Sequence, residues 1–101
     1  MPELVEDSRR STWVVAYDVR LDKRRAKIAK LLVAKGIRVQ KSVFLLEAPP
    51  RNVRRLVREL AALIDEATDC VCAWPLSEGW QATQMNFPAE AAPLQEKFVI
   101  A

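Results

Sequence analysis

The chain has 101 residues, half of them apolar, with no histidine and a formal net charge of +3. This length and composition predict one globular domain with a single hydrophobic core. The absence of histidine excludes Ser-His-Asp and Cys-His nucleophilic catalysis, so any hydrolysis by this chain would depend on carboxylates and on a metal ion held by them.

No apolar stretch approaches the roughly 20 residues that a membrane-spanning helix requires, and the N-terminus lacks the apolar core of a signal peptide. We therefore expect a cytoplasmic protein with no membrane partner. Residues 1–11 are polar and charged and are expected to form a leader. Residues 12–76 are expected to form the folded core, and residues 77–101 a C-terminal extension.

The basic residues are concentrated in the middle of the chain. Residues 20–60 hold thirteen lysines and arginines against three acidic residues, whereas residues 61–101 hold one lysine against six acidic residues. Such a concentration indicates a polyanionic partner such as nucleic acid. Solvated helix faces would give the same pattern and remain the alternative.

The first predicted element is a buried strand over residues 12–20, because Trp13 to Tyr17 form an apolar run rich in aromatic and β-branched residues. Asp18 interrupts this run where the strand should emerge, just before a strongly basic segment. On local chemistry alone, a carboxylate at such a place is more often a turn or helix-capping residue than a catalytic one.

A helix is predicted from Asp22, as its N-cap, to about Lys35. Gly36 is expected to end it in the left-handed conformation. The alternation over residues 37–40 then predicts a half-exposed strand, and the apolar run over residues 43–46 predicts a more central one. We expect a tight change of direction near Lys41 and Ser42, with one long bulged strand as the alternative.

A second helix is predicted from Pro50 to about Glu66, and a further strand over residues 69–76 that stops at Pro75. The order β-α-β-β-α-β predicts an α+β, ferredoxin-like fold in which two helices cover one face of an antiparallel sheet. The second helix opposes its apolar stripe with four basic residues, Arg51, Arg54, Arg55 and Arg58.

The remaining features are two cysteines and the C-terminal segment. Cys70 and Cys72 alternate on a predicted strand, so they should share one face, and a bridge between them would be strained. Without histidine they make a poor zinc site, and two buried thiols are expected. Residues 80–87 should hold one short extended piece. The apolar triplet 98–100 should pair with the edge of its own sheet or with a second subunit.

Three separated blocks of the sequence resemble the Cas-two family, the small CRISPR-associated proteins of the spacer-acquisition machinery. The blocks are a strand that ends in Tyr17-Asp18 and is followed by Asp22-Lys23-Arg24-Arg25, the segment over residues 35–44, and the strand over residues 69–76. The resemblance covers about residues 12–76. It implies a ferredoxin-like fold and a symmetric homodimer in which the final strand of each subunit extends the sheet of the other.

The resemblance also implies a site and partners. Asp18 matches an aspartate that is proposed to bind a divalent metal, Mg²⁺ or Mn²⁺, with its twin across the two-fold axis, which makes Asp18 the catalytic and metal-binding candidate. Family members are described as metal-dependent nucleases of RNA or double-stranded DNA, and as dimers that bridge Cas-one type integrase subunits on spacer DNA. The nucleic-acid-binding candidates are Tyr17, Arg25, Arg38 and Phe44 from the resemblance, and Arg24, Arg51, Arg54, Arg55 and Arg58 from the charge pattern.

Three functions stay open from the sequence. Mg²⁺ usually takes one or two protein carboxylates plus phosphate oxygens, a minimum that two Asp18 side chains at a dimer axis would meet, with Asp22 as an outer-shell helper. The second function is a scaffold that holds duplex DNA through arginine–phosphate contacts without cleaving it. The third is a toxin-like, metal-dependent endoribonuclease of the same fold that acts without an integrase.

Overall fold

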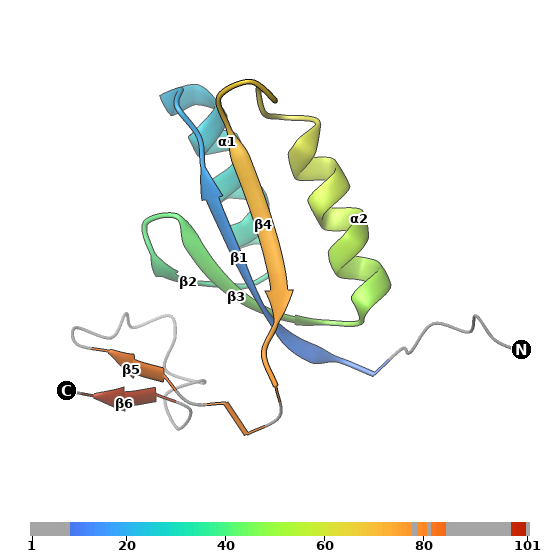
Figure 1. Cartoon of the computed structure of the whole chain (residues 1–101), viewed down its shortest axis with the longest axis vertical. Helices are drawn as coiled ribbons and strands as arrows, with labels where there is room; N and C mark the ends of the chain where they lie inside the picture. Colours follow the sequence, from blue (N-terminus) through green and yellow to red (C-terminus); the bar gives the residue numbers. More distant parts are fainter. Residues whose placement is uncertain (1–8, 78, 81, 85–97, 101) are drawn as a thin grey trace, which may run out of the picture.

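The computed structural model describes residues 9–77, 79–80, 82–84 and 98–100. The elements of the core are β1 (Ser11–Asp18), α1 (Asp22–Val33), β2 (Ile37–Gln40), β3 (Val43–Ala48), α2 (Pro50–Ala61) and β4 (Cys70–Pro75). The four strands form one sheet in the order β2-β3-β1-β4, with every neighbouring pair antiparallel (Figure 1). The predicted α+β, ferredoxin-like fold is confirmed.

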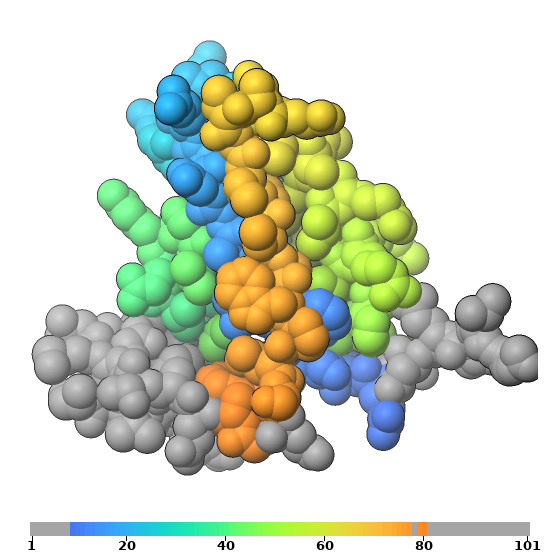
Figure 2. All heavy atoms as spheres, in the orientation of Figure 1, coloured from blue at the N-terminus to red at the C-terminus, as the bar shows by residue number. Residues whose placement is uncertain are grey.

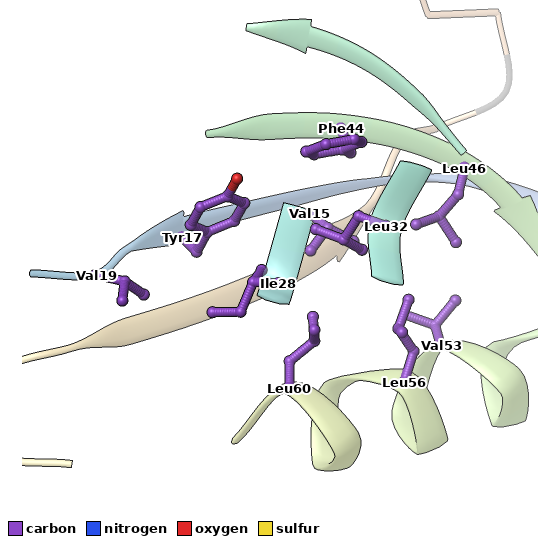
Figure 3. Packing of buried hydrophobic residues seen from close by; sticks show 10 residues of the cluster. All are labelled: Val15, Tyr17, Val19, Ile28, Leu32, Phe44, Leu46, Val53, Leu56 and Leu60. Atoms are coloured by element: carbon purple, nitrogen blue, oxygen red, sulfur yellow. The ribbon is translucent and has the colours of Figure 1, made fainter. Parts of the chain in front are cut away.

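The hydrophobic core lies between the sheet and the two helices. Side chains alternate between the faces of a strand, and on β1 Val15 and Tyr17 point toward the helices and are buried. Figure 3 shows them gathered with Ile28 of α1 and Leu60 of α2. The same alternation places Asp18, which is exposed, on the opposite face of the sheet. Tyr17 and Asp18, although adjacent in sequence, therefore belong to opposite faces of the sheet.

The β2–β3 hairpin turns at Lys41 and Ser42, as predicted. Its register shifts between Arg38 and Gln40, so β2 carries an irregularity even though the single bulged strand is not formed. The turn lies beside the end of β1, because the Tyr17 N–H donates a hydrogen bond of 3.1 Å to the Ser42 carbonyl.

The predicted ends of α1 are wrong in detail. Leu21 is the N-cap, and Asp22 is the first helical residue, where its carboxylate pairs with Arg25 instead of capping the helix. The helix ends at Val33. Gly36 is not left-handed; it is needed because a Cβ there would lie 2.4 Å from the Leu45 carbonyl oxygen, so the chain after α1 packs directly on β3.

Helix α2 begins at Pro50 as predicted but ends at Ala61, five residues before Glu66. The residues that follow form turns held by the Asp69 carboxylate, which accepts the Asp65 backbone N–H at 2.9 Å. Strand β4 therefore begins at Cys70, and it stops at Pro75 as expected.

The predicted extended piece after residue 80 is β5 (Ala82–Gln84), which pairs in parallel with β6 (Phe98–Ile100) in a separate two-stranded sheet. In this single chain β6 thus pairs with β5 and not with an edge of the larger sheet, and its exchange between subunits stays a prediction. Of the expected leader over residues 1–11, residues 1–8 lie outside the described residues, and Ser11 already belongs to β1. Residues 85–97 of the expected C-terminal extension also lie outside the described residues. No helix in the described ranges is long and apolar enough to cross a membrane.

Candidate nucleic-acid and metal site

A groove of about 600 Å³ runs between α1 and the β2–β3 hairpin. Its lining includes Tyr17 and four basic side chains, Arg25, Lys30, Arg38 and Lys41. Positive charge that converges on a concave surface raises the local concentration of anions and favours contacts with phosphate. The structure therefore brings Tyr17, Arg25 and Arg38, three of the predicted nucleic-acid-binding residues, to one groove, and it adds Lys30 and Lys41.

Arg38 is held in place by the hairpin turn. Its Nε and Nη2 atoms both donate to the Lys41 carbonyl oxygen, at 3.1 and 2.7 Å, and its guanidinium lies 5.4 Å from the centre of the Phe44 ring. The Tyr17 hydroxyl donates to the same carbonyl at 3.3 Å, and the Tyr17 and Phe44 rings stack at 6.4 Å. Both aromatic rings are buried, so they orient the arginine from below the groove.

Arg25 braces the loop that follows Asp18. Its Nη1 atom donates to the carbonyl oxygens of Val19 and Arg20, at 2.6 and 2.7 Å, and its Nη2 atom pairs with Asp22. The guanidinium thus fixes the backbone between β1 and α1, and it leaves Asp22 engaged with an arginine on α1.

Arg24, another predicted nucleic-acid-binding residue, is paired with Asp69, a residue that the sequence analysis did not single out. The Arg24 Nε lies 2.8 Å from Asp69 Oδ2, and the Asp69 side chain is fully buried. The carboxylate also accepts hydrogen bonds from the Arg20 and Asp65 N–H groups and from the Thr68 hydroxyl. Burial raises the pKa of Asp69, but these hydrogen bonds together outweigh it and hold the pKa well below its usual value.

Asp18 occupies the other face of the sheet. It is the last residue of β1, it is exposed, and it stands across from Cys70 in the register with β4. The thiols of Cys70 and Cys72 share this face, with their Sγ atoms 3.5 Å apart, and both are exposed, so the prediction that they are buried is wrong. The pKa of Cys70 is raised, mainly by its hydrogen bond and charge interaction with Cys72. Burial and the negative charge of Asp18 raise it further, by smaller amounts.

Asp18 alone offers few ligands for a metal. Its carboxylate has the oxygen chemistry that Mg²⁺ prefers, and no hydrogen bond to it is present in the described part of the chain. Within that part, no three His, Cys, Asp or Glu side chains are grouped to hold a metal ion. The described part of one chain can therefore offer Mg²⁺ a single carboxylate ligand at this position, that of Asp18.

The four predicted arginines of α2 form a third surface. Arg51, Arg54, Arg55 and Arg58 are all exposed, on the side of the helix that faces away from Val53 and Leu56 of the core. None of them lines the groove beside α1. The structure thus divides most of the candidate residues among the groove, the face of the sheet with Asp18 and the α2 surface, while Arg24 pairs with Asp69 and Phe44 is buried.

Comparison with known proteins identifies the family. The family model described as "CRISPR associated protein Cas2" matches residues 11–84. The chain belongs to this family. The CRISPR-associated endoribonuclease Cas2 4 of Rhodospirillum rubrum is 38% identical over 89 residues, which cover 87% of this chain and 72% of that relative.

Solved structures of Cas2 proteins have the same fold as this Cas2 family member. The crystal structure of Streptococcus pyogenes Cas2 matches with a TM-score of 0.62 and 35% identity, over 68% of this chain and 89% of that one. A chain of a partial Cas6-RT-Cas1–Cas2 complex matches with a TM-score of 0.56 and 28% identity, over 67% of this chain and 80% of that one.

Proposed function

We propose that this Cas2 family member acts in CRISPR adaptation as a homodimer that binds duplex nucleic acid and bridges subunits of a Cas1-type integrase. The observation that carries the proposal is the match in fold and sequence to a chain of a complex that contains Cas1 and Cas2. Family membership over residues 11–84 supports the same role.

The distribution of charge supports duplex nucleic acid as the ligand. Arginines on the exposed side of α2 and the basic side chains of the groove beside α1 offer phosphate contacts on two surfaces of each chain. Such contacts give affinity without reading base sequence, and they weaken steeply as salt rises. A homodimer doubles both surfaces, which suits a long duplex.

We further propose that Asp18 and its twin in the second subunit hold Mg²⁺, with Mn²⁺ as a substitute. An ion bound there would polarise a phosphodiester and generate a nucleophilic water. The side chains around Asp18 would then position the nucleic-acid strand that is cleaved. Arg25 fixes the loop after Asp18 through the Val19 and Arg20 carbonyls, and the exposed Asp18 carboxylate points away from the core toward solvent.

The deciding experiment compares the wild type with Asp18→Ala on labelled duplex DNA and on single-stranded RNA. Cleavage and binding are read together with Mg²⁺, with Mn²⁺ and with a chelator. We expect metal-dependent cleavage by the wild type, its loss in Asp18→Ala to the level of the chelator control, and unchanged binding. Glu66→Ala, an exposed acid in the α2–β4 loop, is the matched control and should cleave like the wild type.

Two other outcomes have definite meanings. Binding without cleavage by the wild type would make the protein a scaffold, and cleavage by Asp18→Ala equal to that of the wild type would overturn the metal site. A toxin-like endoribonuclease is the second candidate, favoured by the name endoribonuclease carried by the Rhodospirillum rubrum relative. It would cleave RNA with no integrase present and would inhibit growth when expressed alone.

A further inference from the structure

The sheet face that carries Asp18 also carries a pair of thiols for which the proposed function has no use. Cys70 and Cys72 are exposed on β4, an edge strand of the sheet, and their Sγ atoms are 3.5 Å apart. Cys70 is the cross-strand partner of Asp18, and such partners have Cβ atoms roughly 4.5–5.5 Å apart on one face. Figure 2 shows β4 in orange running down the middle of the molecule, in front of the other elements.

We propose that Cys70 and Cys72 chelate a thiophilic divalent cation of the zinc class, with the Asp18 carboxylate as the neighbouring oxygen donor. Zinc binds thiolates at about 2.3 Å in tetrahedral geometry, which places two sulfur ligands about 3.8 Å apart. The Sγ atoms at 3.5 Å need only a small rotation to reach that separation. Binding releases the thiol protons to solvent.

A disulfide suits this pair less well than a metal ion. A disulfide requires sulfur atoms about 2.0 Å apart and Cα atoms no more than about 6.8 Å apart. Alternate residues of a strand are separated by about 6.6–6.8 Å, which is at the upper end of that range, and pairing with Ala16 and Asp18 of β1 holds β4 in that extended form. Both cysteines are free thiols, and a metal bridge spans them without moving the backbone.

Asp18 is the nearest candidate for a third ligand. No three donors are already assembled around one point in the described ranges, so Asp18 must rotate toward the ion, which its exposed position at the end of β1 allows. Carboxylate oxygens are accepted zinc ligands, and water would complete the tetrahedron. The site is thus a two-thiolate chelate that recruits Asp18, not a closed structural zinc centre.

The donor set also determines which cation binds. Thiolates select zinc-class ions, whereas Mg²⁺ takes oxygen ligands and keeps several waters. A bound zinc-class ion would therefore compete with Mg²⁺ for Asp18. This competition rests on the proposed function, but binding by the thiols does not.

The test uses the full chain, reduced and free of metal, and Cd²⁺ alone as the probe. Ultraviolet absorption from thiolate-to-metal charge transfer reports the bond to sulfur directly. Because Cd²⁺ is the softer ion and binds thiolates more tightly, a large excess of Zn²⁺ should be needed to displace it and remove the band. We expect a band that saturates at one ion per chain and is lost in Cys70→Ser and in Cys72→Ser. Asp18→Asn should keep the band but bind Cd²⁺ about ten-fold more weakly, while Glu66→Gln, at an exposed acid of the α2–β4 loop, should match the wild type.

Two results would overturn the proposal. One is the absence of a charge-transfer band when stoichiometric Cd²⁺ is added to the reduced wild type, and the other is a band of equal strength in Cys72→Ser. Circular dichroism of the serine variants checks that these exposed substitutions leave the fold intact. Because none of these readouts measures cleavage, failure of the nuclease proposal would leave the result unchanged.

Discussion

The Asp69 carboxylate connects its own loop to the β1–α1 loop and to helix α1, through contacts with Arg20 and Arg24 that span 49 and 45 residues of sequence. It pairs with Arg24 of α1, accepts the Arg20 N–H after β1, and accepts the Asp65 N–H and the Thr68 hydroxyl in its own loop. A fully buried carboxylate with this many donors is stabilised in its charged form. Asp69 therefore fixes the end of the sheet at which the chain leaves β1, directly after Asp18.

We expect Asp69→Asn to lower the melting temperature at pH 7 by roughly 5 °C or more, because the amide loses the ion pair and cannot accept at every donor. The pKa of Asp69 is lowered by folding from an ordinary value of 3.8. The stabilisation is therefore fully present above that value and is lost as pH falls through the folded-state pKa. Thermal unfolding followed by circular dichroism from pH 7 to pH 3 measures both effects.

The pH series distinguishes the charge of Asp69 from a general loss of packing. The gap in melting temperature between the wild type and Asp69→Asn should narrow as the pH falls below about 4. Glu66→Gln removes an exposed carboxylate from the same loop and should unfold like the wild type throughout. A gap that stays constant down to pH 3 would contradict the assignment of the effect to the ionised carboxylate.

The sequence could indicate Asp18 but not Asp69, because only Asp18 stands in a recognisable local pattern. Asp18 interrupts an apolar run and stands in a family motif, whereas Asp69 is held by Arg20 and Arg24, which are 49 and 45 residues away, as well as by groups of its own loop. The only signal for Asp69 was an acidic residue at the start of an apolar strand. The same contact explains why Arg24, predicted from charge alone, turned out to be ion-paired with a buried acid.

For the helices and strands, local sequence patterns predicted the type of each element, whereas contacts between distant residues determined where some of them end. Pro50 opens α2 and Pro75 ends β4 as predicted, because the missing N–H of proline acts locally. Helix α2 stops at Ala61, where the loop held by Asp69 begins. Gly36 was expected to adopt a left-handed conformation, but its requirement comes from the close approach to Leu45 of β3.

The exposed side of α2 carries a prediction about nucleic-acid binding. The combined change Arg51→Ala, Arg55→Ala and Arg58→Ala removes three exposed charges from one side of the helix. If all three contact phosphate, the slope of log K against log salt for duplex DNA should fall in magnitude by about 2.7, at about 0.9 per contact. Fluorescence anisotropy at several salt concentrations measures this slope.

A control on the same helix isolates phosphate contacts from changes in helix stability. Glu59→Ala removes an exposed acidic residue of α2 and should keep the wild-type slope without weakening binding. The triple variant should also unfold within a few degrees of the wild type, because exposed side chains contribute little to stability. If the triple variant keeps the wild-type salt slope, these arginines do not contact phosphate, and the groove beside α1 becomes the expected binding surface for the duplex.

In the whole molecule, the candidate surfaces are separate: the groove beside α1, the open face of the sheet with Asp18, and the exposed side of α2. The alternation of side chains on β1 puts Tyr17 with the helices and Asp18 on the open face, a consequence of strand geometry that the sequence already implied. What the sequence could not supply is the environment of each face: basic side chains around Tyr17, and thiols beside Asp18. In the part of the chain that the structure describes, the end of β1 offers one carboxylate on this face, Asp18, so the proposed metal site would take its second carboxylate from the other subunit.

The open face of the sheet is a suitable surface for that second subunit. Trp74 of β4 is 46% exposed and stands across from Val14, on the same face as Ala16 and Asp18. An exposed tryptophan among apolar neighbours is typical of an interface, and tryptophan side chains at interfaces often contribute about 2 kcal/mol or more to binding. Packing of two such faces would also bring the two Asp18 carboxylates toward each other.

We therefore expect the wild type to be a dimer and Trp74→Lys to dissociate at least about 30-fold more readily, since burial of the new charge opposes association. Light scattering coupled to size exclusion over a range of protein concentrations measures the shift. Val33→Lys introduces the same charge at an exposed apolar residue beside the groove, 59% exposed on α1, and should leave the dimer intact. If Val33→Lys dissociates the dimer and Trp74→Lys does not, the subunits associate through the helices, and the two Asp18 carboxylates lie too far apart to share a metal ion.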